Sequence, residues 1–208
     1  MVAAAVARVA ERDNLSPLRV HKLLAMVSDL EELLEGLGFC LSEVSDQLSQ
    51  WRGYAQAGHG LAIGFSQEYL GQLAQHLMDK RQPSFTLGKT EYQLDQHDLR
   101  VDPTYRQLRE YIDRGALDFP QIPGLLDMRT EEQLEAERTS RDDAERNASR
   151  TVFLLFSELY LLKSPAFQEE KEWRVLTYRP RGSPTAGKCE YRAAHDRIVP
   201  FRTVELVE

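Results

Sequence analysis

The stretch SEVSDQLSQWRGYAQAGHGLAIGF, residues 42–65, decides the fold that we expect, because it joins a short helical pattern, a glycine turn and an apolar run. Ser45 or Asp46 is expected to cap a short helix, since either side chain can accept hydrogen bonds from the first free N–H groups. The apolar residues that recur at helical spacing are Leu48, Trp51 and Ala55. This spacing predicts a buried helical face.

The second half of the stretch predicts a turn and a strand. Gly58 and Gly60 are expected to end the helix. The run from Leu61 to Phe65 is short and apolar, which is typical of a strand with both faces covered. We therefore expect a helix, a glycine turn and a buried strand in that order.

Two motifs carry a resemblance to a known family. The first is QWRxYA at residues 50–55, followed by Gly60 and the apolar run, and the second is FQEEKEWRV at residues 167–175. With these motifs the sequence resembles the bacterial domain of unknown function 2971, with a family-like core over residues 38–208. Members usually begin with a further N-terminal strand and loop that we do not find, so the resemblance implies a shortened or divergent N-terminus.

Composition narrows the classes of function. The chain has 208 residues, a formal net charge of -7 and 42% hydrophobic residues, which is ordinary for a globular protein. The acidic balance argues against a broad nucleic-acid surface. Cys40 and Cys189 are the only cysteines, so neither a metal quartet nor a disulfide framework is indicated. Without a signal-peptide pattern or a run of about 20 apolar residues, the protein is expected to be cytoplasmic and not membrane-bound.

The remaining patterns predict an α+β fold, with a mixed or mostly antiparallel central sheet flanked by helices. Helices are expected over 2–13, 17–34, 67–80, 103–115 and from 130 onward. Strands are expected from residue 39 and over 85–94, 172–178, 189–192 and 198–206. We expect one domain over 1–208, in which residues 1–15 form a peripheral or frayed helix.

The helix expected from residue 130 changes character along its length. Its first part is charged, with opposite charges at helical spacing such as Glu137 with Arg141, which favours a solvated helix that projects from the body. From Val152 the same helix becomes apolar and is expected to be deeply buried, ending at Ser164-Pro165. Residues 130–150 could be a surface helix, a hinge or a partner-binding arm.

The second motif offers candidate chemistry. Alternation along a strand puts Glu170, Glu172 and Arg174 on one face, while Trp173 and Val175 point into the core. Arg174 could hold an anion and Glu172 could act as a base or as an electrostatic stabiliser. The alternative is a salt bridge with only a structural role.

The first motif could form a wall of the same pocket. Arg52 and Tyr54 carry donors suited to phosphate or carboxylate, and the turn at Gly60 would let a ligand approach while His59 transfers a proton. The alternative is a core Trp51, an Arg52 with its stem packed, a packed Tyr54 and a turn without function. No histidine pair has metal-ligand spacing, so no metal is predicted.

Two functions remain open. In the first, the protein binds an anionic small molecule or nucleotide with Trp51, Arg52, Tyr54, Gly60 and Arg174, and Glu172, Glu170 and His59 are catalytic. By analogy alone, the Glu-Lys-Glu strand start looks like that of ADP-ribosyltransferases, and no particular cofactor is indicated. In the second, the protein is a non-catalytic interaction module that engages a partner with the 130–150 helix or with the alanine-rich N-terminus.

Overall fold

The computed structural model describes residues 1–55, 59–80, 85–119, 124, 127–181, 190–194, 197–201 and 203. These residues group into two compact units. Unit 1 comprises residues 1–31 and 93–162, and unit 2 comprises residues 32–92 and 163–208. Helices and antiparallel sheets together confirm the α+β class. A single domain over 1–208 stays a prediction.

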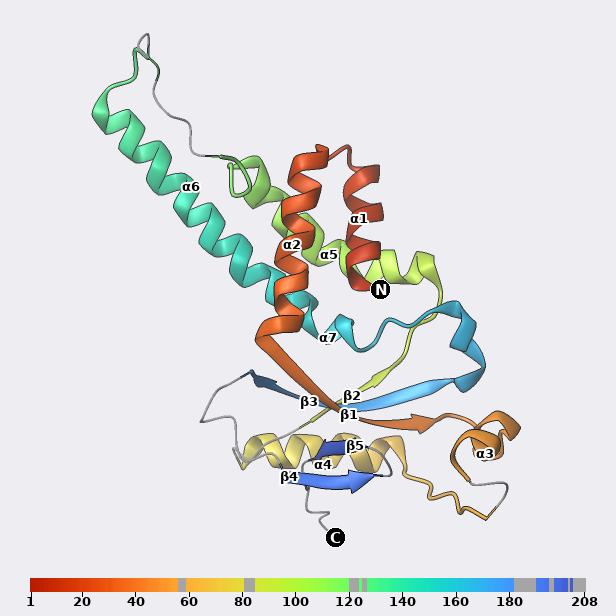
Figure 1. The fold of residues 1–208 in the computed structure, drawn as a ribbon. Helices are drawn as coiled ribbons and strands as arrows, with labels where there is room; N and C mark the ends of the chain where they lie inside the picture. Colours follow the sequence, from red (N-terminus) through yellow and green to blue (C-terminus); the bar gives the residue numbers. More distant parts are fainter. Residues whose placement is uncertain are drawn as a thin grey trace. The chain divides into compact units, whose positions relative to one another are not determined.

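Unit 1 is helical (Figure 1). Its elements are α1 (Val2–Arg12), α2 (Pro17–Leu33, whose last turn enters unit 2), α5 (Leu94–Asp113), α6 (Glu131–Val152), the 3-10 turn η2 (Phe153–Leu155) and α7 (Phe156–Leu159). The apolar side of α1, with Val2, Val6 and Val9, is buried, and α1 contacts α5. The first helix is therefore packed along its length.

Helix α5 begins eight residues before the expected start at Asp102-Pro103, so that prediction was wrong. Pro103 lies inside the helix, where it removes one backbone hydrogen bond. The turns before Pro103 bury His97, Asp98 and Val101. Because helices in proteins are stabilised mainly by packing, this burial offsets the cost of the proline.

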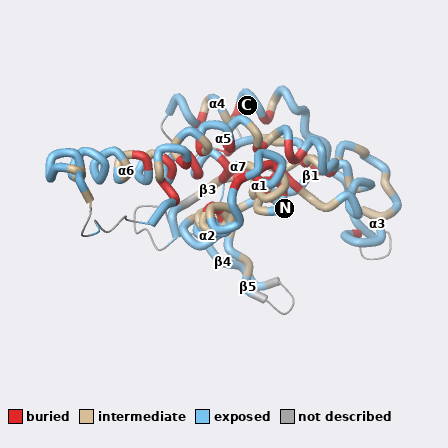
Figure 2. Tube along the Cα trace, turned by 90° about the horizontal axis from the view of Figure 1, so that it is seen from above, coloured by how far each residue is buried: buried red, intermediate tan, exposed pale blue. Residues whose placement is uncertain are grey.

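Helix α6 begins where the sequence predicts. The Thr130 side chain accepts from the Gln133 N–H and the Gln133 side chain accepts from the Thr130 N–H, forming a capping box. The first part of α6 is exposed and its buried residues lie at the C-terminal end (Figure 2). The helix stops at Val152 rather than at Ser164, and Phe153 and Leu154 are exposed because the 3-10 turn changes the direction of successive side chains. Deep burial of the whole apolar half was a wrong prediction.

Unit 2 contains the sheets. Its elements are β1 (Leu34–Ser42), α3 (Leu48–Tyr54), α4 (Gln67–Asp79), β2 (Thr86–Lys89), the 3-10 helix η3 (Pro165–Glu170), β3 (Glu172–Pro180), β4 (Glu190–Ala194) and β5 (Arg197–Phe201). The main sheet is antiparallel in the order β1-β3-β2, and β4 pairs with β5 in a separate hairpin. None of the described helices in either unit is long and apolar enough to cross a membrane.

The main sheet has two different faces. Val175 pairs with Phe39 and Leu87 across the ladders, and it packs against the buried cluster of Leu70, Leu73, Leu77 and Phe85 that α4 contributes to. Gly36 and Gly38 lie inside β1. A Cβ at Gly38 would approach Leu176 Cδ2 to 3.0 Å, so glycine there leaves room for the buried Leu176 on the second face.

The stretch from Leu48 to Phe65 differs most from expectation. Helix α3 follows Gln47, and neither Ser45 nor Asp46 caps it. Leu48 is 63% exposed, so of the predicted buried face only Ala55 is buried and Trp51 is half-buried. The helix ends at Tyr54, before the glycines, and Gly58 lies outside the described residues. Residues 61–65 are exposed and form no strand, so the predicted buried strand was wrong.

We expect Leu73→Ala to destabilise unit 2 by about 3 kcal/mol, because it leaves a cavity among buried side chains. Both tryptophans of the chain, Trp51 and Trp173, lie in unit 2, so denaturant unfolding followed by tryptophan fluorescence reports on this unit. Met78→Ala on the same helix is the control. Met78 is 59% exposed, and its loss should change the free energy of unfolding by less than about 0.5 kcal/mol. Equal effects of the two changes would contradict the described core.

Candidate functional site

The second face of the sheet in unit 2 holds a buried carboxylate at the start of β3. Glu172 is 5% exposed, and its Oε2 accepts from Arg174 Nη2 at 2.9 Å and from Lys163 Nζ at 3.0 Å. Lys163 Nζ also donates to Glu170 Oε2 at 2.5 Å. We call these four residues, two cations and two carboxylates, the Glu172 cluster.

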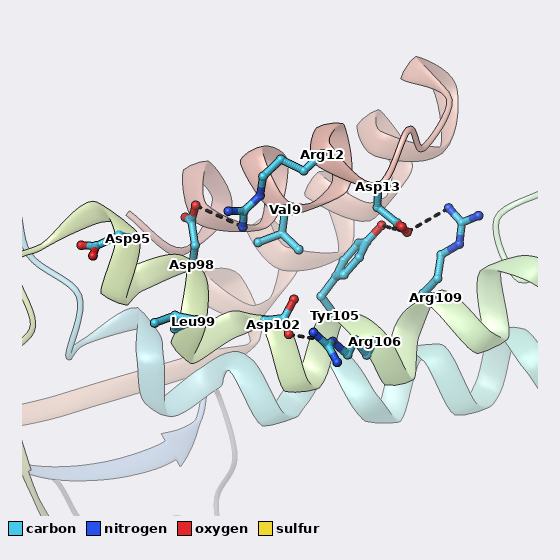
Figure 3. A pocket seen from close by; sticks show the side chains of 10 residues that line it. All are labelled: Val9, Arg12, Asp13, Asp95, Asp98, Leu99, Asp102, Tyr105, Arg106 and Arg109. Carbon is cyan, nitrogen blue, oxygen red and sulfur yellow. Dashed lines mark hydrogen bonds and ion pairs between the residues drawn. The ribbon is translucent and has the colours of Figure 1, made fainter.

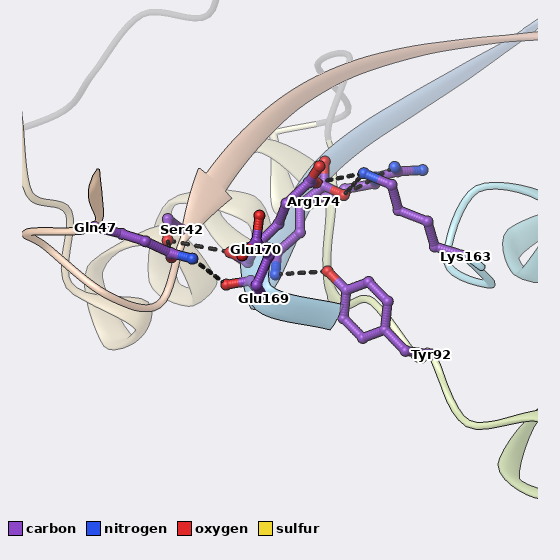
Figure 4. Close-up of polar contacts among 8 residues, drawn as sticks. Ser42, Gln47, Tyr92, Lys163, Glu169, Glu170 and Arg174 are labelled. Atoms are coloured by element: carbon purple, nitrogen blue, oxygen red, sulfur yellow. Dashed lines mark hydrogen bonds and ion pairs between the residues drawn. The ribbon is translucent and has the colours of Figure 1, made fainter. Parts of the chain in front are cut away.

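The backbone brings the two glutamates to one lysine. Lys171 adopts a left-handed conformation (φ 44°) between η3 and β3, which turns the chain sharply between Glu170 and Glu172. Glu170 therefore lies at the end of η3. The prediction that Glu170 shares a strand face with Glu172 was wrong. The Tyr92 hydroxyl accepts from the Glu172 N–H at 2.9 Å, which holds the start of β3 in place (Figure 4).

The charges of the cluster fix its ionisation. Burial acts to raise the pKa of Glu172, but hydrogen bonds from Arg174, Cys40 and Lys163 outweigh it and leave this pKa below its usual value. Burial acts to lower the pKa values of Lys163 and Arg174, yet their carboxylate partners raise both. Glu172 is thus a carboxylate held between two permanent cations, and it is a poor proton donor or acceptor near neutral pH.

Cys40 lies across the ladder from Arg174, and its thiol faces the same carboxylate. Cys40 is exposed as a residue, but its thiol is partly buried. This burial is the larger cause, and the hydrogen bond to Glu172 the second, that raise the pKa of Cys40 to about 11. A thiol with this pKa is protonated near neutral pH, and the thiolate is the nucleophile. Cys40 therefore acts here as a hydrogen-bond donor.

The two sequence motifs adjoin through the segment before α3. The Gln47 side-chain amide donates to the Glu169 carbonyl, and the Ser42 hydroxyl donates to the Glu170 carbonyl at 3.1 Å (Figure 4). The Trp51 indole N–H donates to Asp46 Oδ1 at 2.8 Å. These bonds connect the segment that precedes the first motif to the backbone of the second motif and, through Asp46, to Trp51 of the first.

The residues predicted on the first motif do not join the Glu172 cluster through any described contact. Arg52 is exposed and makes no described hydrogen bond or ion pair, and Tyr54 is 83% exposed. His59 is exposed in the turn after α3, where its N–H donates to the Ala55 carbonyl. A Cβ at Gly60 would lie 2.7 Å from the Ala55 Cβ, so this glycine is needed for close packing within the turn.

The predicted division of faces on β3 is present. Val175 contacts the α4 cluster, and Glu172 and Arg174 lie on the opposite face. Trp173, expected in the core, is only partly buried, with Lys89 Nζ 5.8 Å from its ring centroid. The aromatic ring therefore borders the core rather than filling it.

The sequence analysis did not predict three residues of the site: Lys163, which belongs to the Glu172 cluster, and Tyr92 and Cys40, which contact it. Lys163 closes the short apolar run 159–162, and Tyr92 lies in the segment after β2. Cys40 reaches Glu172 only because of the β1-β3 register. A lysine that closes an apolar run was the single signal available in the sequence.

Unit 1 contains a groove of about 710 Å³ between α1 and α5 (Figure 3). None of the predicted site residues lines it. Several of its polar groups pair with one another: Arg12 lies 3.3 Å from Asp98, Arg106 lies 2.7 Å from Asp102, and the Tyr105 hydroxyl donates to Asp13. Since the Glu172 cluster contains Glu170, Glu172 and Arg174 and the groove contains none of the predicted site residues, we place the candidate site at the Glu172 cluster.

Fold and site together define an α+β protein in which an ion-paired carboxylate cluster lies on one face of an antiparallel sheet. A family model described as Protein of unknown function (DUF2971) matches residues 50–175, and the chain belongs to this family. The match contains both motifs and confirms the resemblance that they carry. No curated protein and no solved structure matches the chain.

The stabilisation contributed by Glu172 should depend on pH. Because its pKa is lowered in the folded protein, its contribution is complete above the ordinary glutamate pKa of about 4.3 and is lost as the pH falls through the folded value. The free energy of unfolding should therefore differ between wild type and Glu172→Gln most at pH 7 and less at about pH 3. Glu169→Gln, a change at an exposed neighbour, is the control. A constant difference between pH 7 and pH 3 would contradict the assignment.

Cys40 should react slowly in the folded protein. With a pKa of about 11 against about 8.5 for a free cysteine, its thiolate population at pH 8 is lower by roughly 100-fold. We expect iodoacetamide to label the Cys40 peptide at least that much more slowly in the native protein than in urea, as followed by mass spectrometry. Similar rates in the two states would show that the thiol does not face the carboxylate.

Proposed function

We propose that this protein is a non-catalytic interaction module. In it the two family motifs, QWRxYA at residues 50–55 and FQEEKEWRV at residues 167–175, stabilise the fold of unit 2. The observation that carries this proposal is the saturation of Glu172. Its carboxylate already accepts from Arg174, Lys163 and Cys40 in a buried position. A catalytic carboxylate must reach a substrate, whereas this one is committed to internal partners.

The first motif supports the same conclusion. The Trp51 indole is satisfied by Asp46, and Gly60 packs against Ala55. These contacts fix the turn that follows α3 and leave no assigned role for a ligand. A motif can be typical of a family because the fold requires it. The Trp51–Asp46 hydrogen bond and the packing of Gly60 on Ala55 are contacts that the fold requires.

The partner surface that we propose is the charged part of α6 within residues 130–150. The capping box and the ion pairs of Arg129 with Asp127 and Glu137 stabilise its first turns locally. These local contacts add to the packing of Ala144 and Ala148 further along the helix, and most side chains in this part are exposed. Its excess of carboxylates favours a partner with a basic surface.

The second candidate is binding of an anionic small molecule or nucleotide by Arg52 and Arg174, with Trp51, Tyr54 and Gly60 as further contacts. Glu172, Glu170 and His59 would then be the catalytic residues. One observation favours it: Gln47 and Ser42, in the segment that precedes the first motif, donate to the backbone of Glu169 and Glu170 in the second. Lys163 would add a second cation beside Arg174.

One experiment separates the two functions. If the motifs are structural, Arg174→Ala should lower the free energy of unfolding of unit 2 by about 3 kcal/mol, because it leaves a buried carboxylate short of a cation. Arg52→Ala is the matched control and should change it by less than about 0.5 kcal/mol, since Arg52 is exposed. Phosphate, NAD and ATP at millimolar concentration should not raise the melting temperature of the wild type.

The opposite outcome is equally specific. A ligand present at 100 times its dissociation constant stabilises the folded state by about 2.7 kcal/mol, which a thermal shift detects. If one of these anions raises the melting temperature of the wild type and Arg52→Ala abolishes the rise, the protein is an anion-binding protein and the proposed function is wrong.

A further inference from the structure

The chain passes between the two units at three crossings, residues 31–32, 92–93 and 162–163. The first crossing lies within α2, and only the last residues of this helix, 32 and 33, belong to unit 2. Because helix ends fray readily, this crossing can loosen at little cost to unit 1. The other two crossings flank the segment 93–162, which supplies α5, α6 and α7 to unit 1.

Both of these crossings are bound to Glu172. Tyr92 is the last residue of unit 2 before the segment, and its hydroxyl accepts from the Glu172 N–H at 2.9 Å. Lys163 is the first residue of unit 2 after the segment, and its Nζ donates to Glu172 Oε2 at 3.0 Å (Figure 4). The Lys163 N–H also donates to the Glu91 carbonyl at 2.9 Å. One glutamate therefore holds both ends of the segment 93–162.

Holding both ends of the segment affects the stability of unit 1. Bringing the ends of a flexible segment together costs conformational entropy, and this cost grows with the length of the segment. The bonds at Glu172 keep the two ends together within unit 2, so the packing of α5, α6 and α7 does not have to offset that entropy. When unit 2 unfolds, the ends are released and unit 1 must close the segment with its own contacts.

We propose that the Glu172 cluster couples the folding of the two units, so that unfolding of unit 2 also destabilises unit 1. The pair that carries the coupling is well protected from water, because Glu172 is 5% exposed and the Lys163 side chain is 22% exposed. Breaking a buried ion pair costs far more than breaking an exposed one, so both crossings stay attached while unit 2 is folded.

This coupling goes beyond the proposed function, since it requires no partner at α6. The two proposals can also fail separately. An anion that raises the melting temperature through Arg52 would refute the proposed function and leave the coupling intact.

Two optical probes test the coupling because they follow different units. Tryptophan fluorescence follows unit 2, and far-ultraviolet circular dichroism follows mainly unit 1, which contains α1, α5 and α6. In urea the two midpoints of the wild type should agree within about 0.2 M, as expected for coupled unfolding. Leu73→Ala, in the core of unit 2, should lower both midpoints together by about 1 M.

A double variant releases the crossings. Lys163→Met with Tyr92→Phe removes both side-chain bonds to the crossings and keeps the pair of Glu172 with Arg174. Residues 163–171 then become a longer tether between β3 and the segment 93–162. The fluorescence midpoint of this variant should fall below its circular-dichroism midpoint by at least about 0.5 M urea. Adding Leu73→Ala should then lower only the fluorescence midpoint.

Lys89→Met is the matched control. It removes an exposed ion pair of the same unit, with Lys89 Nζ 2.9 Å from Glu43 Oε2, and neither residue lies at a crossing. Its two midpoints should stay together. If unit 2 of the double variant does not fold, Lys163→Met alone gives the same comparison with the same expected separation. Wild-type midpoints that differ, a Leu73→Ala change that lowers only the fluorescence midpoint of the wild type, or released variants whose midpoints coincide would overturn the proposal.

Discussion

The structure of unit 2 depends on the ion pairs that the buried Glu172 carboxylate makes with Lys163 and Arg174. A buried carboxylate is costly to desolvate, and it is tolerated only when cations and further hydrogen bonds compensate it. Lys163 and Arg174 supply the charges, and Tyr92 holds the backbone beneath them. These partners come from different parts of the chain, so the cluster joins the approach to β3 with the segment after β2.

The same interaction fixes the protonation states of Glu172 and Cys40. A glutamate between two cations keeps its charge, and a thiol against that glutamate keeps its proton. Both effects remove reactivity that the sequence would have allowed. The family match covers both motifs, and the second of them supplies Glu170, Glu172 and Arg174 to the cluster.

Hydrophobic patterning predicted those elements whose apolar faces are covered within the described chain. Helices α1, α2, α4 and α6 begin close to the expected residues, and β3 begins at Glu172 as predicted. The predictions failed where local signals and packing disagree. Pro103 indicated a helix start but lies inside α5, because the preceding turns bury three residues. The run at 61–65 indicated a buried strand but is exposed, because burial needs a covering layer that sequence pattern does not supply.

The sequence by itself determined the α+β class, the family and the placement of Glu172 and Arg174 on one face of β3, since alternation along a strand and the two motifs are local properties. Only the tertiary structure decided that Lys163 and Cys40 complete the cluster and that Arg52 makes no described contact with it. The reason is physical: strand register and the left-handed turn at Lys171 set which distant side chains meet, and neither is encoded in local spacing.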